Sequence, residues 1–262
     1  MRCAHPDLAY LRTYRRALKV ARLYQLPHCD SVDTLASKLG IGDLFRLPRV
    51  ILRIVFPGGS PTPAHQDWAT VQGYQGAATL WVPLISCPLA VGPVCAIPGS
   101  HHRGLWQRTS GGSLQDEVVI TGDDDRWAAA EVGVGDAVLF RSLTVHRALP
   151  NVSRILRLSI DFRMQPLHET LHPGSLLPPD GFRTWDDVYM SWTAAERRLA
   201  RYWRERHPPI EPAAAGLRSS LAQAKEDLAQ AEGDLAQAKG DETREIERML
   251  AQVEELRPAQ AQ

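Results

Sequence analysis

The sequence lacks the features that mark a cysteine-based metal site, a membrane span or a nucleic-acid-binding surface. Its four cysteines, Cys3, Cys29, Cys87 and Cys95, form no C-x-x-C pair, so zinc and redox motifs are not supported. No apolar run approaches the roughly 20 residues that a membrane-spanning helix needs, and the first residues lack the apolar core of a secretory signal. Lysine plus arginine and aspartate plus glutamate both number 30, so no basic excess favours nucleic acid. These absences favour a cytoplasmic protein with reduced thiols that binds neither membranes nor nucleic acid.

Residues 1–45 are predicted to form an N-terminal helical segment. Leu8, Leu11 and Leu18 recur with helical spacing, and the stretch "VDTLASKLG" continues this pattern as far as Gly40. A glycine after the last periodic residue commonly ends a helix, because glycine adopts the left-handed conformation at low cost. We therefore expect the helical segment to stop at Gly40.

Residues 46–166 have the pattern of a β-rich core. Short apolar runs with many β-branched residues, such as "RVILRIVF", "AATLWVPL" and "ILRLSIDFRM", alternate with glycine and proline. Short strands separated by turn residues are typical of a β-sandwich or barrel. The sequence therefore predicts a mainly β fold with flanking helices.

Residues 167–212 are predicted to be a helical cover that packs on this core. Val188, Trp192, Leu199 and Trp203 would lie along one side of a single helix. The prolines that follow would end that helix.

Residues 213–262 contain three consecutive heptads, "LAQAKED", "LAQAEGD" and "LAQAKGD". Leucine at every seventh position favours a coiled-coil helix and self-association through the heptads. Gly233 and Gly240 each cost a helix about 1 kcal/mol, so a partly disordered tail is the alternative.

The stretch "PAHQDW" contains the first candidates for chemistry. His65 and Asp67 are two residues apart, which places both side chains on one face if the chain is extended there. His146 follows the apolar strand "DAVLF" and a short turn, and can point back across the sandwich. Two imidazoles and one carboxylate on one face of an octahedron are the ligands of an iron(II) centre that activates dioxygen. A lone histidine on a strand is more often structural, so the metal interpretation depends on all three residues meeting.

The strand "ILRLSIDFRM" alternates polar and apolar residues. Arg157, Ser159, Asp161 and Arg163 share one face, and the apolar residues share the other. A buried arginine needs an anion beside it. A dicarboxylate cosubstrate would supply that anion, and a guanidinium group matches a carboxylate geometrically.

Five further residues are candidates for contacts with small molecules. Thr79 and Trp81 share one face of "ATLWVPL" and could contact a bound acid. Trp68 and Gln72 follow the ligand stretch and could line a substrate pocket, although Trp68 could equally belong to the core. Arg53 either faces the cavity, where it would meet an acidic substrate, or faces solvent.

The motifs "HQDW", "TLWVPL", "GPVCAIPGSHHRG" and "GDAVLF", followed by a histidine and by an arginine eleven residues later, occur in one order along the chain. In this order and spacing, from about residue 45 to residue 165, the sequence resembles the phytanoyl-CoA dioxygenase-like family. The resemblance implies a double-stranded β-helix, or jelly-roll, core that binds iron(II) and 2-oxoglutarate and consumes dioxygen. Matched position by position, it implies three iron ligands and three cosubstrate contacts: His65, Asp67 and His146 for iron, and Arg157, Trp81 and, more weakly, Thr79 for 2-oxoglutarate.

One departure from the family pattern concerns the cosubstrate. Some members have a serine two residues after the distal histidine that helps to hold 2-oxoglutarate, and here that position is Ala148. Another group must then supply the hydrogen bond, or the cosubstrate binds with one fewer.

The function that the resemblance implies is hydroxylation, or a related oxidation such as desaturation or cyclisation, of a C–H bond in a small metabolite. Succinate and carbon dioxide would be released. The residues do not identify the substrate; an intermediate of secondary metabolism is the expectation. Two alternatives remain open from the sequence: a non-catalytic jelly-roll binding module, and an interaction protein in which the heptads matter most.

Overall fold

A computed structural model describes residues 8–108, 118–120, 126–179 and 182–212 of the 262-residue chain. The predicted heptads therefore lie outside the described residues. Within the described ranges, no helix is both long enough and apolar enough to cross a membrane. Cys29, Cys87 and Cys95 are free thiols there.

The larger of two antiparallel sheets is organised around one long strand, β7 (Arg157–Pro166). On one edge β7 pairs first with β2 (Ile51–Val55) and then with β1 (Leu44–Arg46), and on the other with β3 (Ala78–Pro83). Strand β5 (Val138–Arg141) pairs with β3. Because β1 starts at Leu44, the predicted helical segment 1–45 includes the first part of this sheet.

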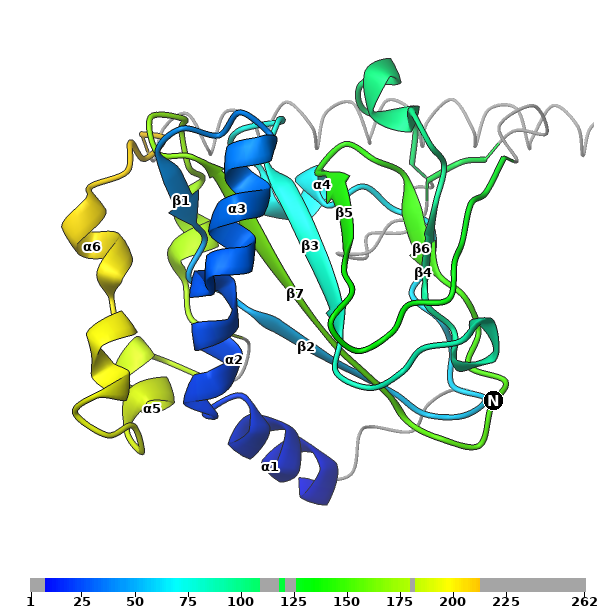
Figure 1. Cartoon of the computed structure of the whole chain (residues 1–262), viewed down its shortest axis with the longest axis horizontal. Coiled ribbons are helices and arrows are strands. Elements are labelled where there is room, and N and C mark those ends of the chain that lie inside the picture. The colour runs from blue at the N-terminus through cyan, green and yellow to red at the C-terminus, as the bar shows by residue number, and fades with distance from the viewer. Residues whose placement is uncertain (1–7, 109–117, 121–125, 180–181, 213–262) are drawn as a thin grey trace, which may run out of the picture. The chain divides into compact units, whose positions relative to one another are not determined.

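The smaller sheet consists of β4 (Val94–Ala96) and β6 (His146–Ala148), which are antiparallel. An isolated bridge joins His65 to His146, with the two backbones donating to each other at 2.9 and 3.0 Å. This bridge attaches the segment between β2 and β3 to the edge of the smaller sheet. In Figure 1 the smaller sheet lies on the opposite side of β3 and β5 from the N-terminal helices.

The N-terminal helices cover the apolar face of the larger sheet (Figure 1). They are α1 (Leu8–Ala17), α2 (Ala21–Gln25), the 3-10 helix η1 (Leu26–His28) and α3 (Asp30–Lys38). Gly40 follows α3 with φ +73°, and the Ile41 amide donates back to the Ala36 carbonyl, which confirms the predicted helix end. The main hydrophobic core joins these helices to the sheet: Leu18, Ala21, Tyr24, Val32 and Ala36 pack with Leu80, Ile160, Phe162 and Met164.

The prediction of a single helix running from Val188 to Trp203 is wrong. The structure has three short helices there, α5 (Trp185–Tyr189), η6 (Glu196–Leu199) and α6 (Tyr202–Arg206). Arg201 adopts a left-handed conformation with φ +62°, which a continuous right-handed helix does not allow. The aromatic packing itself was predicted correctly, because Trp185, Val188, Tyr189 and Trp192 are buried in the main core and Trp203 packs against it.

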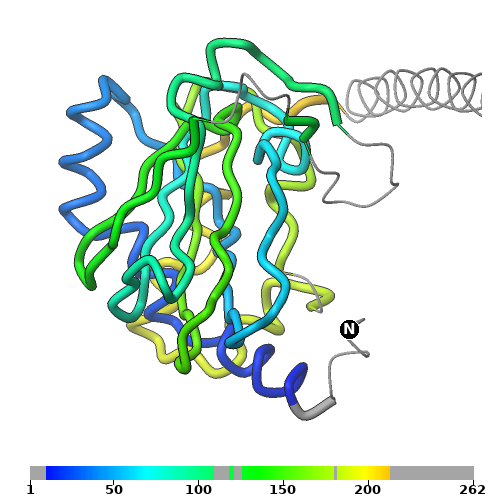
Figure 2. Tube along the Cα trace, turned by 90° about the vertical axis from the view of Figure 1, so that its right-hand side faces the viewer, coloured from blue at the N-terminus to red at the C-terminus, as the bar shows by residue number. Residues whose placement is uncertain are grey.

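Short helices also occupy the connections that position the site. They are α4 (Trp68–Val71), η2 (Leu89–Val91), η3 (Ser100–Arg103) and η5 (Pro173–Leu176). Figure 2 shows the extended segments of both sheets running alongside one another, with the N-terminal helices beside them in blue.

Strand β7 is buried on both faces, which distinguishes it from an ordinary half-exposed strand. Ile160, Phe162 and Met164 enter the core beneath the helices. The polar residues of the opposite face are equally buried, and they are Arg157, Ser159, Asp161, Arg163 and Gln165. Buried polar groups lower stability unless they have hydrogen-bond or charge partners. This polar face of β7 is therefore the candidate location of a functional site.

Candidate metal and cosubstrate site

The three predicted ligand residues converge on one point. His65 Nε2 lies 3.7 Å and His146 Nε2 lies 3.8 Å from Asp67 Oδ1. One ligand atom from each residue lies within 4.8 Å of the other two, and the imidazole centroids are 4.2 Å apart. The sequence prediction that His146 points back toward His65 and Asp67 is confirmed.

The backbone route to this convergence differs from the predicted one. His65 is in the bridge to His146, but Asp67 has φ −57° and ψ −33° and directly precedes helix α4. The two side chains therefore meet because the chain turns into a helix at Asp67, and the extended-strand argument for this pair was wrong.

Backbone carbonyls set the tautomer of both imidazoles. His65 Nδ1 lies 2.8 Å from the Pro63 carbonyl oxygen, and His146 Nδ1 lies 3.0 Å from the Thr144 carbonyl oxygen. Because a carbonyl oxygen only accepts hydrogen bonds, each Nδ1 carries the proton and donates. Each Nε2 then presents its lone pair toward Asp67 Oδ1, as a metal ligand must.

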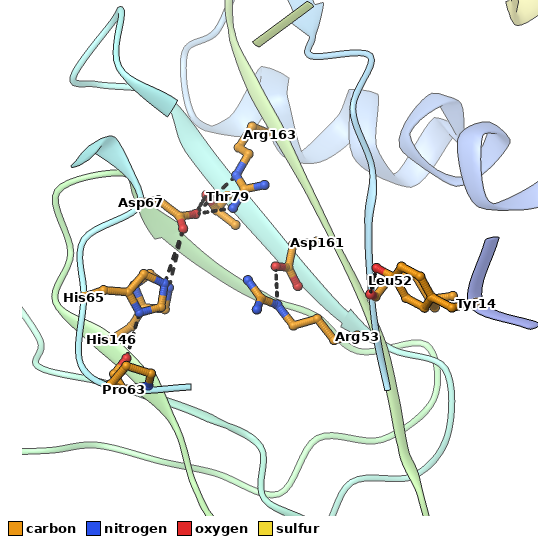
Figure 3. A network of polar contacts seen from close by, with 10 residues as sticks. All are labelled: Tyr14, Leu52, Arg53, Pro63, His65, Asp67, Thr79, His146, Asp161 and Arg163. Atoms are coloured by element: carbon orange, nitrogen blue, oxygen red, sulfur yellow. Dashed lines mark hydrogen bonds and ion pairs between the residues drawn. The ribbon is translucent and has the colours of Figure 1, made fainter. Parts of the chain in front are cut away.

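The second oxygen of Asp67 is fully engaged by protein groups. Asp67 Oδ2 accepts from the Thr79 hydroxyl at 2.6 Å and from Arg163 Nε and Nη2 at 3.2 and 2.9 Å (Figure 3). Thr79 and Arg163 are register partners on β3 and β7, so the sheet itself holds this clamp. Only Oδ1 faces the two imidazoles.

The electrostatics of the site favour the protonation states that a metal requires. Burial alone would raise the pKa of Asp67, but Arg163 and the two imidazoles outweigh it and hold that pKa well below its usual range. Burial and the neighbouring His65 lower the pKa of His146 to about 3, against a smaller opposing effect of Asp67. At neutral pH Asp67 is therefore an anion, and His146 is a neutral imidazole whose Nε2 lone pair is available to a metal.

A narrow pocket adjoins the triad. Trp81 and Ala148 contribute to its wall, and Arg53 donates from Nε to Asp161 Oδ2 at 2.6 Å within it. Figure 3 shows the other nitrogens of Arg53 turned toward the side of His65 and Asp67. The lining residues are Arg53, Thr62, His65, Trp81, Val94, Phe140, His146, Arg147, Ala148, Arg157 and Asp161.

Arg157 is a buried cation that forms no ion pair with a carboxylate of the described chain. Its side chain is 1% exposed, and Nη1 donates to the Gly92 carbonyl. Nε has no hydrogen-bond partner among the described residues, and burial lowers the pKa of this guanidinium. A buried guanidinium with a free donor is incomplete without an anion.

The carbonyl of Gly92 accepts the hydrogen bond from Arg157. The backbone around Gly92 is closely packed, and this leads to a first prediction. It has φ +82°, and a Cβ there would lie 2.4 Å from the Leu149 carbonyl oxygen and 2.9 Å from Pro150 backbone atoms. Gly92→Ala is expected to lower the free energy of unfolding by about 3 kcal/mol or more, because left-handed strain adds to a backbone clash. Gly58→Ala is the matched control, since Gly58 has φ +68° but no atom within 4 Å of the place that a Cβ would take; it should cost only about 1 kcal/mol. Urea denaturation measures both, and equal costs would refute the packing argument.

Only some of the residues predicted to contact small molecules line the cavity. Trp81, Arg53 and Arg157 line the cavity, whereas Thr79 bonds to Asp67. Trp68 and Gln72 are not part of this lining.

Trp68 makes a local contact, whereas Gln72 Oε1 is buried without a hydrogen-bond partner among the described residues. Trp68 Nε1 donates to the Gly73 carbonyl at 2.9 Å, and Gln72 ends α4 with φ 53°. His101 and His102 lie in η3 and do not join the ligand group.

Arg163 is the site residue whose role the sequence did not reveal. Strand alternation placed it on the polar face of β7, but nothing in the order of residues indicated that β3 and β7 align Arg163 with Thr79 beside Asp67. A second arginine on that face was the only available signal.

The sequence also matches a known protein family that fits this geometry. The sequence model of the phytanoyl-CoA dioxygenase (PhyH) family matches residues 29–159, half of the 262 residues. The chain belongs to the phytanoyl-CoA dioxygenase (PhyH) family. Iron(II) and 2-oxoglutarate are the cofactors of this family, and the donor set of two imidazoles and a carboxylate fits the metal. The free Nε of buried Arg157 fits a carboxylate of the cosubstrate.

Curated relatives of this PhyH-family chain include two bacterial hydroxylases. The 1-deoxypentalenic acid 11-beta-hydroxylases of Streptomyces exfoliatus and Streptomyces arenae are 28% and 30% identical over 116 residues. Each match covers 40% of this chain and 41% of the relative, so the chain spans less than half the length of these relatives.

Solved structures with a similar trace include two non-haem enzymes. The epimerase SnoN in complex with Fe3+, alpha ketoglutarate and nogalamycin RO is 22% identical, with a TM-score of 0.46 over 65% of this chain and 66% of that one. The non-heme monooxygenase ThoJ is 22% identical, with a TM-score of 0.48 over 76% of this chain and 90% of that one.

Proposed function

We propose that this chain is an iron(II)- and 2-oxoglutarate-dependent oxygenase. It would hydroxylate, or otherwise oxidise, a C–H bond of a small organic molecule and release succinate and carbon dioxide. The observation that carries the proposal is the meeting of His65 Nε2, Asp67 Oδ1 and His146 Nε2 in a buried site beside a cavity. PhyH-family membership supports the same conclusion.

In this proposal His65, Asp67 and His146 hold the metal. Bound iron(II) and 2-oxoglutarate supply the dioxygen activation and the oxidising power, and the protein supplies position. The Pro63 and Thr144 carbonyls keep the imidazole protons on Nδ1, so both Nε2 atoms remain donors. The clamp on Asp67 Oδ2 leaves one oxygen for the metal.

Arg157 is the proposed partner of the distal carboxylate of 2-oxoglutarate. Trp81 lines the same cavity and is the proposed packing contact of the cosubstrate. Thr79 was predicted to contact the cosubstrate, and in this proposal its hydrogen bond to Asp67 Oδ2 also positions the metal ligand. The proposed catalytic core covers residues 46–166, with 1–45 and 167–212 as flanking segments.

Arg53 is the proposed contact for the substrate, and the substrate is proposed to be an organic acid. Three arginines, Arg53, Arg147 and Arg157, line the cavity with one carboxylate, Asp161, so its lining carries an excess of positive charge. The curated relatives act on an acid, 1-deoxypentalenic acid. Trp68 and Gln72 can contact only a substrate that extends beyond the described cavity.

The test begins with anaerobic addition of iron(II) and 2-oxoglutarate, for which we expect the weak visible charge-transfer absorption of an iron(II)–2-oxo acid chelate. The second step measures succinate release in the presence of organic acids, each compared with its methyl ester. Acids should stimulate release and their esters should not, and Arg53→Gln should reduce that difference. Absence of the absorption band would refute the oxygenase proposal and favour a non-catalytic binding module.

The alternative hypothesis, an interaction protein that associates through the heptads, predicts a different result. Oligomers would persist in a metal chelator and 2-oxoglutarate would not be consumed. Size-exclusion chromatography of the full chain with and without chelator, run beside the succinate assay, separates this alternative from the oxygenase.

A further inference from the structure

The motif "PGSHHRG" follows strand β4 and supplies no ligand atom, but one of its side chains reaches the stretch that carries His146. Ser100, the first residue of η3, is 3% exposed. Its hydroxyl donates to the Ile97 carbonyl at 2.7 Å and accepts from the Val145 amide at 2.9 Å. A hydroxyl has one proton. Because that proton is used on Ile97, the oxygen is left to accept from Val145.

The peptide group that Ser100 holds also sets the tautomer of His146. This group, between Thr144 and Val145, contains the Thr144 carbonyl and the Val145 amide. The carbonyl accepts from His146 Nδ1 at 3.0 Å, and the amide donates to Ser100 Oγ at 2.9 Å. A trans peptide group is planar, with its C=O and N–H on opposite sides, so a hydrogen bond at one end fixes the direction of the other. Ser100 therefore orients the carbonyl that keeps the His146 proton on Nδ1.

A second buried side chain, Gln66, fixes the preceding peptide group. It is 1% exposed, and its Nε2 donates to the Leu143 carbonyl at 2.6 Å and to the Gly104 carbonyl at 2.8 Å. Its Oε1 accepts from the Trp106 amide at 2.9 Å. Two carbonyl acceptors and one amide donor determine which end of this side-chain amide is the nitrogen. Both peptide groups that flank the Cα of Thr144 are therefore held by buried side chains.

Gln66 also connects the two stretches that carry the proposed ligands. His65 and His146 exchange backbone hydrogen bonds at 2.9 and 3.0 Å, and the Trp68 amide donates to the Ser142 carbonyl at 3.0 Å. Between these two contacts the chain turns into α4, so regular backbone pairing does not continue there. The Gln66 side chain supplies the connection at that point.

We propose that Ser100 is a positioning residue for the metal site. It orients the Thr144–Val145 peptide group, which keeps the His146 proton on Nδ1 and leaves the Nε2 lone pair for the metal. Gln66 supports this arrangement by holding the neighbouring peptide group. The inference rests on the proposed function, because it takes His146 as a metal ligand. It assigns a role to two residues that belong neither to the ligand group nor to the cavity lining.

The first measurement is the tautomer of His146 in the metal-free protein at neutral pH. Long-range proton–nitrogen NMR correlations distinguish the protonated from the unprotonated ring nitrogen, and the signals that disappear in His146→Gln identify this ring. In the wild type, Nδ1 should be the protonated nitrogen. In Ser100→Ala the Val145 amide loses its acceptor and the peptide group can turn. The form protonated at Nε2 should then appear, and the two nitrogen shifts should move toward each other.

The second measurement is the affinity of the same proteins for cobalt(II), followed by visible absorption. Changes to groups that orient a ligating histidine cost about ten- to a hundredfold in metal affinity, so Ser100→Ala should bind cobalt(II) more weakly by that factor. Ser100→Cys nearly keeps the side-chain volume but offers only a weak sulfur acceptor, so its affinity should lie between those of wild type and Ser100→Ala. Gln66→Met, which keeps the chain length without the amide, should also weaken binding.

Two buried residues outside this network are matched controls. The Ser175 hydroxyl donates to the Val71 carbonyl at 3.1 Å, and Gln165 Nε2 donates to the Glu169 carbonyl at 2.9 Å. Neither residue lines the cavity. Ser175→Ala and Gln165→Met should lower the free energy of unfolding, because each removes a buried hydrogen bond. They should leave the His146 tautomer and the cobalt(II) affinity unchanged.

A Ser100→Ala protein that is less stable but keeps the wild-type tautomer and cobalt(II) affinity would show a purely structural role. That result would overturn the inference and leave the oxygenase proposal intact. Failure of the wild-type protein to bind cobalt(II) would instead overturn the proposed function. If Ser100→Ala does not fold, both measurements are made on Ser100→Cys, and the same two results decide the question.

Discussion

Asp67→Ala is expected to abolish iron(II) binding in practical terms, with a loss of affinity well above a hundredfold. Changes to groups that only support a ligand cost about ten- to a hundredfold, and this change removes one of three ligands. The truncation also leaves Arg163 and the Thr79 hydroxyl without the oxygen they hold at 2.6 to 3.2 Å. Cobalt(II) titration of the variant followed by visible absorption measures the loss.

Formate should partly restore metal binding in Asp67→Ala. The vacated space is bounded by a buried guanidinium and a hydroxyl, which are the donors that a small carboxylate requires. Formate bound there would offer its second oxygen toward His65 and His146. The double variant Asp67→Ala/Arg163→Met provides the control, since it has lost the cation that attracts formate. Equal rescue of both variants would show that Arg163 does not orient the carboxylate.

The convergence of the three proposed iron ligands was predictable from the sequence because it depends on residue type and order. His65, Asp67 and His146 stand in motifs whose spacing resembles one family, and the structure brings their donor atoms together. The polar face of β7 was equally predictable from strand alternation. Both predictions needed only local patterns.

What the sequence did not reveal depends on strand register and backbone conformation. The clamp on Asp67 requires Thr79 to lie opposite Arg163, and alternation fixes the face of a side chain without fixing its partner on the next strand. The prediction of a single helix from Val188 to Trp203 failed for a related reason. Aromatic spacing correctly indicated burial, but it carries no signal for the left-handed conformation of Arg201 that interrupts the helix.

Arg163→Met is expected to reverse the pH dependence that Asp67 imparts to the stability of the metal-free protein. In the wild type the pKa of Asp67 in the folded state is held well below its usual value, so the contribution of this group is fully present above about pH 4 and is lost on acidification below it. Without Arg163, burial dominates and raises that folded-state pKa above the unfolded value. The folded state then binds more protons than the unfolded state, so stability falls as the pH rises from about 4 toward 7.

The size of this effect follows from the burial of the pair. Asp67 is 4% exposed and Arg163 is 6% exposed, and removing one partner of a buried ion pair costs about 3–5 kcal/mol. Urea denaturation of the metal-free protein at pH 4.5 and pH 7, two conditions chosen to bracket this window, should show a larger penalty at the higher pH. Arg163→Lys keeps the charge and should show little of this pH dependence, while losing the two-pronged contact with Oδ2. A penalty for Arg163→Met that does not change with pH would mean that Arg163 stabilises the sheet through packing alone. In that case another group must set the charge of the carboxylate that faces the two imidazoles.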